Sequence, residues 1–137
     1  MFVRVLASAD GKLPQPMRAG VGLLANVAPK IFTTETDENL SMADIGGGLI
    51  HQGTTLTSDV NYTLPTAATI AASFSTMDVG DAYSFMVNNS QLGAFDVVIV
   101  VNTGITKVGT NNTLSVPPQS TRIFTLIKTA AATYDLL

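Results

Sequence analysis

The chain has 137 residues, of which ten are acidic and seven basic, so its net charge at pH 7 is −3 and its pI is about 4.7. It contains no cysteine, which excludes disulfides and thiolate metal sites. The seven cations are scattered without interleaved aromatic residues, and no apolar run approaches the roughly 20 residues of a transmembrane helix, so we expect neither nucleic acid nor a membrane as partner.

Residues 1–45 are predicted to form an extended N-terminal arm, because Pro14, Pro16 and Pro29 disfavour helices and central strands and no hydrophobic period is sustained. Near its start lies the short apolar stretch "FVRVL" (2–6), which has high β propensity. This stretch has two interpretations. It is either a strand that pairs with a neighbouring protein or the first strand of the main domain.

Residues 46–137 are predicted to form one β-sandwich domain with a short helix. The helix begins at Pro65 or Thr66 and spans about ten residues, because Ala67, Ile70 and Phe74 recur at helical spacing. The expected strands, separated by turn residues, are Leu49–Thr57, Val60–Leu64, Ala82–Asn89, Ala94–Val101, Ile105–Val108, Thr113–Val116, Arg122–Thr129 and Thr133–Leu136. Many short strands at this spacing predict an all-β, jelly-roll-like sandwich.

The chain contains one histidine, His51, which lies inside a predicted strand. A catalytic role would require a nucleophile and an orienting group close to it in space, and no G-x-S-x-G motif is present. The run Gly46–Gly48 lacks the Lys and Ser or Thr that follow the glycines of a phosphate-binding loop. We therefore expect no catalytic residue, no cofactor and no enzymatic activity.

Acidic residues cluster in "TTETDEN", which contains Glu35, Asp37 and Glu38, and a second pair brackets the turn at Asp78 and Asp81. Neither run has the spacing of a calcium loop, so no metal site is expected. The cluster is either a solvated loop or an acidic patch that contacts a basic partner surface.

Three stretches of residues 42–137 together resemble a domain of tailed-phage virion proteins. They are "MADIGGGLIHQGTTLTSDVNYTLPTAATIAASF", "VGDAYSFMVNNS" and "VVNTGITKVGTNNTLSVPPQSTRIFTLIKTAAATYDLL". The likeness lies in the order and spacing of a Gly-Gly-x-Ile segment, an "LPTAA" helix, a "VGD" strand, an "NTG" turn and a closing strand. Residues 1–41 lie outside the resemblance.

The resemblance implies a jelly-roll-like capsid decoration (cement) protein, made in the host cytoplasm and bound to the outer capsid surface of the virion. Its partners would be the major capsid protein and a second copy of itself, as a homodimer or alternatively a trimer. The alternative is a receptor- or glycan-binding knob or fibre protein of a phage tail, and a small hydrolase is a third possibility. The expected interface residues are Phe2, Val3, Arg4, Val5, Leu6, Glu35, Asp37 and Glu38.

Overall fold

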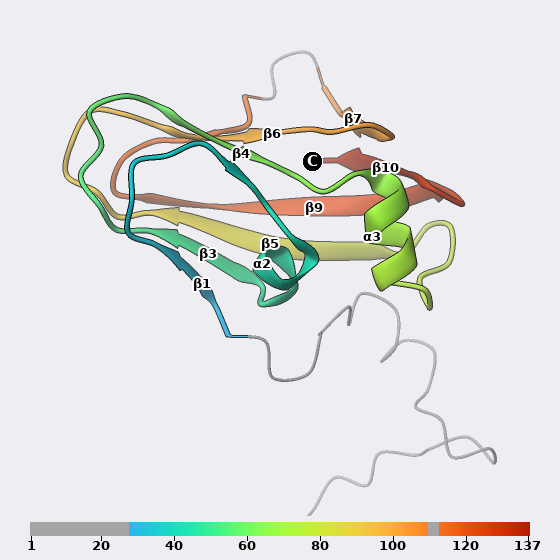
Figure 1. The fold of residues 1–137 in the computed structure, drawn as a ribbon. Helices are drawn as coiled ribbons and strands as arrows, with labels where there is room; N and C mark the ends of the chain where they lie inside the picture. Colours follow the sequence, from blue (N-terminus) through green and yellow to red (C-terminus); the bar gives the residue numbers. More distant parts are fainter. Residues whose placement is uncertain (1–27, 110–112) are drawn as a thin grey trace, which may run out of the picture.

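The computed structural model describes residues 28–109 and 113–137, and these fold into two β-sheets that face each other (Figure 1). In spatial order, the six-stranded sheet consists of β1 (Lys30–Phe32), β3 (Leu49–Gln52), β5 (Ala82–Asn89), β9 (Ser120–Ala130), β10 (Thr133–Leu136) and β7 (Ile105–Lys107). The four-stranded sheet consists of β2 (Glu38–Asn39), β4 (Val60–Thr63), β6 (Val97–Val100) and β8 (Ser115–Val116). The described chain is therefore an all-β, sandwich-like fold.

From β1 to β9 the chain changes sheets after every strand, and only β9 and β10 follow each other in the same sheet. As a result, β1, β3 and β5 are parallel neighbours in one sheet, while β2, β4 and β6 are parallel neighbours in the other. The connections that lead from β1, β3 and β5 to the opposite sheet gather at one end, on the left of Figure 1. We call these three connections (residues 33–37, 53–59 and 90–96) the crossing loops.

This strand pairing differs from two predictions. A jelly roll is built from antiparallel Greek keys, whereas most neighbours in these sheets are parallel, so the jelly-roll topology is not confirmed. The arm was predicted to extend to residue 45. However, β1 pairs with β3 and β2 pairs with β4, so these two strands are part of the sandwich. Residues 1–27 lie outside the described part of the chain.

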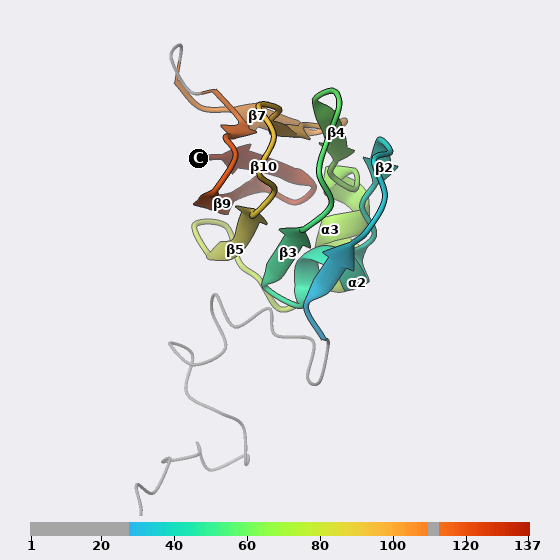
Figure 2. The same cartoon turned by 90° about the vertical axis from the view of Figure 1, so that its left-hand side faces the viewer.

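Two helices cover the end of the sandwich opposite the crossing loops, where α2 contacts α3 (Figures 1 and 2). Helix α3 (Ala67–Ser73) was predicted, and Thr66 caps it by accepting a hydrogen bond from the amide of Thr69. Helix α2 (Met42–Gly46) was not predicted, so the expectation of one helix was wrong. Its signal is the capping box of Ser41 and Asp44, which is easily missed before so short a helix.

Aromatic side chains join the layers in the core. The rings of Phe32 in β1 and Tyr62 in β4 lie 4.5 Å apart and connect the two sheets. Tyr83 in β5 packs on Phe74 at the end of α3, and its hydroxyl donates to the carbonyl of Ile45 in α2 at 2.6 Å. Burial raises the pKa of the Tyr83 hydroxyl, which therefore remains a donor. Each such side chain contributes roughly 1.5–3 kcal/mol through burial.

Gly104, in the turn between β6 and β7, has no room for a side chain. Its φ is 82°, and a Cβ there would lie 2.6 Å from the Cβ of Ala67 and 3.0 Å from the carbonyl oxygen of Ala132. The amide of Ala67 also donates to the carbonyl of Thr103 in the same turn. The turn and the first residue of α3 are therefore packed backbone against backbone.

We predict that Gly104→Ala destabilises the protein much more than Gly80→Ala. Gly80 also has a positive φ, 98°, but a Cβ there would meet nothing within 4 Å. Gly80→Ala should cost only the backbone strain of about 1–2 kcal/mol, whereas Gly104→Ala adds an overpacking cost of roughly 1–3 kcal/mol. Urea unfolding of both variants measures the difference. Equal decreases in the free energy of unfolding would show that a Cβ at residue 104 is accommodated beside Ala67 without an overpacking cost.

Candidate interaction surface

The structure places the acidic members of the predicted interface at the crossing-loop end. Glu35 and Asp37 lie in the first crossing loop and Glu38 is the first residue of β2. Glu35 and Glu38 are half-buried, and Asp37 is exposed. The other predicted interface residues lie outside the described part of the chain; these are Phe2, Val3, Arg4, Val5 and Leu6.

Glu35 binds the second crossing loop. Its carboxylate accepts hydrogen bonds from the amide and the hydroxyl of Thr57, at 2.6 and 2.8 Å, and from the amide and the hydroxyl of Ser58, at 2.7 and 3.2 Å. These bonds, led by that from the Thr57 hydroxyl, lower the pKa of the Glu35 carboxyl. Glu35 therefore holds two successive crossing loops together.

Two further carboxylates repeat this arrangement. Asp37 accepts from the amide of Asn61 at 2.7 Å, at the start of β4, and Asp59 accepts from the amide of Asp96 at 2.7 Å. The first bond joins the first crossing loop to β4, and the second joins the second crossing loop to the third. Much of the acidic cluster thus satisfies backbone amides within the fold, and any contact of these residues with a partner remains a prediction.

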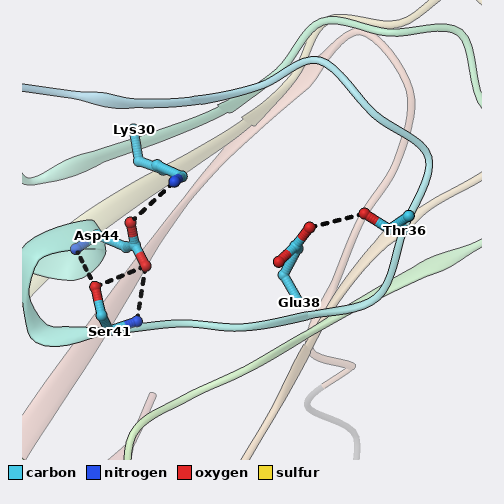
Figure 3. A network of polar contacts seen from close by, with 5 residues as sticks. All are labelled: Lys30, Thr36, Glu38, Ser41 and Asp44. Atoms are coloured by element: carbon cyan, nitrogen blue, oxygen red, sulfur yellow. Dashed lines mark hydrogen bonds and ion pairs between the residues drawn. The ribbon is translucent and has the colours of Figure 1, made fainter.

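A local network surrounds the start of α2 (Figure 3). The Asp44 carboxylate accepts from the amide and hydroxyl of Ser41, at 2.7 and 2.8 Å, and pairs with Lys30 of β1 at 3.4 Å. Burial raises the pKa of Asp44, but the Ser41 hydrogen bonds and Lys30 together outweigh it and lower the pKa. Glu38, in the same view, accepts from the Thr36 hydroxyl at 2.7 Å. The network attaches α2 to the edge strand β1.

The outward side of the six-stranded sheet carries almost no charge. We define this outer face by the residues that alternate with buried ones along its strands: Ile31, Leu49, His51, Ala82, Ser84, Met86, Asn88, Thr106, Thr121, Ile123, Thr125, Ile127, Thr133 and Asp135. Asp135 is the one Asp, Glu, Lys or Arg among them. Three apolar members are well exposed, Ile31 and Ile123 at 61% and Met86 at 40%.

The apolar members of the outer face lie side by side. Met86 is paired in register with Leu49 of β3 on one side and with Ile123 of β9 on the other. Together they form a continuous apolar row across three strands, flanked by the hydroxyls of Ser84 and Thr125, which are 2.8 Å apart. Depletion of charge and contiguous apolar residues are typical of the centre of a protein–protein interface.

The cations of β9 do not point to the outer face. Arg122 alternates with the outward residues, covers the ring of Phe124 at 4.9 Å and donates to the carbonyls of Thr113 and Ser115. Lys128 donates to the carbonyl of Met77 at 2.7 Å. Both cations therefore bind carbonyls near the ends of the sandwich, and Asp135 is the one Asp, Glu, Lys or Arg on the outer face.

His51 lies at the crossing-loop end of the outer face. Its Nδ1 lies 2.7 Å from Oδ1 of Asn88 in the neighbouring strand β5, and its Nε2 lies 3.3 Å from Oγ of Ser90. The sequence did not reveal these neighbours, because Asn88 and Ser90 are 37 and 39 residues away and meet His51 only through the parallel pairing of β3 with β5.

Within residues 28–109 and 113–137, no three His, Asp or Glu side chains are grouped so that they could hold a metal ion. None of the helices in these ranges is long and apolar enough to cross a membrane. Comparisons with protein-family models, curated proteins and solved structures found no match to this chain.

We predict that Glu35→Gln lowers stability at neutral pH and that this effect fades in acid. Because the folded-state pKa of Glu35 is depressed below its ordinary value of 4.5, the carboxylate contributes stability above that pH and loses it as the pH falls through the folded-state pKa. Urea unfolding of both proteins, at pH 7 and at pH values below 4.5, measures this. The matched control is Glu38→Gln, which removes a carboxylate that accepts from the nearby Thr36 hydroxyl. A loss of stability for Glu35→Gln that stays constant with pH would contradict the assignment.

Proposed function

We propose that the protein is a non-enzymatic virion component that decorates a tailed-phage capsid and stabilises it by bridging major capsid protein subunits. The observation that supports this most is the outer face of the six-stranded sheet, which carries a single charged residue, Asp135, and the apolar row of Leu49, Met86 and Ile123. The sequence resemblance to virion proteins supplies the class of partner. The proposal rests on the sandwich and requires neither a jelly-roll strand order nor an arm that extends to residue 45.

The outer face is proposed to bind the shell. A face with one carboxylate and many hydroxyls is covered by a partner with little loss of charge hydration, whereas an ion left unpaired in the contact would cost several kcal/mol. A sheet face is also rigid, so little side-chain and loop ordering opposes binding. If each copy contacts two shell subunits, opening the shell requires breaking several contacts together.

The other parts of the chain have separate proposed roles. Residues 2–6 add a strand to the sheet edge of a neighbouring subunit, because an extended apolar segment gains main-chain hydrogen bonds there. The free protein is proposed to be a homodimer, with a trimer as the alternative. It acts on the outer surface of the virion after synthesis in the host cytoplasm.

We predict that Ile123→Lys weakens binding to purified empty phage heads at least tenfold, because an ammonium group would be buried in an apolar contact. Co-sedimentation at several protein concentrations measures occupancy. The matched control is Val79→Lys, which places the same charge at a residue that is 66% exposed and lies outside the outer face. Equal binding of both variants would overturn the docking surface. A wild-type protein that ignores heads but binds host cells or glycans would replace the capsid proposal with the tail-knob alternative.

We predict that removing residues 1–8 lowers capsid occupancy while the fold stays intact. All the strands that the structure describes lie at or after Lys30, so we expect the truncated protein to keep its two sheets. Occupancy is measured by co-sedimentation with heads, and the urea midpoint reports the fold. Full occupancy by a folded, truncated protein would refute strand addition by residues 2–6.

A further inference from the structure

A chain of hydrogen bonds connects four polar side chains at the crossing-loop end of the outer face. Asn88 donates through Nδ2 to the Thr121 hydroxyl at 2.7 Å, and its Oδ1 lies 2.7 Å from Nδ1 of His51. On the other side of the ring, Nε2 lies 3.3 Å from Oγ of Ser90. The four residues come from β3, β5, the loop after β5, and β9.

The surroundings of Asn88 fix the tautomer of His51. The Asn88 amide nitrogen faces the carbonyl oxygen of Ser120 as well as the Thr121 hydroxyl, and a carbonyl only accepts, so the Nδ2 atom must point that way. Oδ1 therefore faces His51 and can only accept. The proton of the neutral ring must then be on Nδ1, which leaves Nε2 with a free lone pair directed at Ser90.

Ser90 is exposed and has two acceptors for its one proton. Its Oγ lies 3.3 Å from His51 Nε2 and 3.3 Å from the carbonyl oxygen of Gln52. When the hydroxyl donates to Nε2, the serine, the histidine and the orienting amide have the relationship of a nucleophile, a general base and the group that positions the base.

Residue 53, next to this pair, is glycine, so no side chain there crowds the two atoms. A Cβ on Gly53 would lie 3.0 Å from His51 Nε2 and 3.8 Å from Ser90 Oγ. Its φ is not in the left-handed region, so the backbone conformation does not require glycine there. A side chain at residue 53 would therefore lie against both reacting atoms, and glycine keeps that position clear beside the exposed Ser90.

From this geometry we propose that Ser90 is a covalent modification site that accepts one acyl group per chain from an activated ester or thioester. Oγ attacks the acyl carbon as its proton passes to His51 Nε2, and a new Oγ–C bond forms. The bond from carbon to the leaving oxygen or sulfur then breaks, and the proton on Nε2 is transferred to that leaving group. Asn88 is a positioning residue. This reactivity is stoichiometric and goes beyond the proposed structural role.

The test uses p-nitrophenyl acetate with the full-length protein, following p-nitrophenol release and locating the acetyl group by peptide mass spectrometry. We expect acetylation of Ser90 about 100-fold faster than of Ser84, the size of a general-base effect. Ser84 is an exposed serine of the same sheet face whose hydroxyl contacts Thr125 and no histidine. Its rate is the internal control for an unassisted hydroxyl.

Four variants separate reaction from folding, each checked by its urea midpoint. His51→Gln and Ser90→Ala should abolish acetylation at position 90, and Gly53→Ala should slow it without removing a reacting atom. Asn88→Ala should shift the pH profile of the rate, which a purely structural role would leave in place. Equal labelling of Ser84 and Ser90, or unchanged p-nitrophenol release from folded Ser90→Ala, would overturn the proposal.

Discussion

The chain changes sheets after almost every strand, and the backbone amides of each crossing loop need hydrogen-bond acceptors. The fold depends on the side chains that provide these acceptors. In this fold, side chains of one crossing loop accept hydrogen bonds from backbone amides of another. Glu35 holds the amides of Thr57 and Ser58, and Asp59 holds the amide of Asp96. Gln91, which is fully buried, accepts from the amide of Leu56. Buried or crowded backbone groups without such partners would each cost about 1–3 kcal/mol.

Many of the described charged side chains have partners away from the outer face. Several carboxylates accept hydrogen bonds at the crossing loops, and Lys30 pairs with Asp44 beside α2. Arg122 and Lys128 donate to carbonyls near the ends of the sandwich. In a chain with only 12% charged residues, little remains for the outer face. The outer face carries hydroxyls, aliphatic groups and one carboxylate, so a partner would cover it with little loss of charge hydration.

The sequence predicted the elements that have a clear hydrophobic period or that end at clear turn residues. β5 and β10 were predicted with their observed bounds, and α3 lies within the predicted helix. β1 and β2 were missed, because strands of three and two residues show no measurable alternation and Pro29 precedes the first. Sheet order could not be predicted, since parallel pairing joins segments that share no turn.

The outer face, too, could be predicted from the sequence only in part. The alternation of Ile123, Thr125 and Ile127 with Phe124 and Leu126 already distinguishes an outer from an inner side of β9. What it could not reveal is that Met86 and Leu49 continue the same row, because that depends on register between strands far apart in sequence. The acidic cluster shows the converse: its composition suggests an exposed patch, whereas Glu35 is bonded within the fold.

The Ser90–His51–Asn88 cluster arises from the same parallel pairing. β3 and β5 run in the same direction, and both end at the crossing-loop end of the sheet. His51 therefore lies opposite Asn88, and Gly53 and Ser90 are the first residues of two crossing loops. His51 and Asn88 belong to the outer face, and Ser90 adjoins it. A partner that covers this end of the face would therefore exclude acyl donors from Ser90. Docking and acylation would then compete for the crossing-loop end of the outer face. The rate of Ser90 acylation would therefore report whether a partner covers that end.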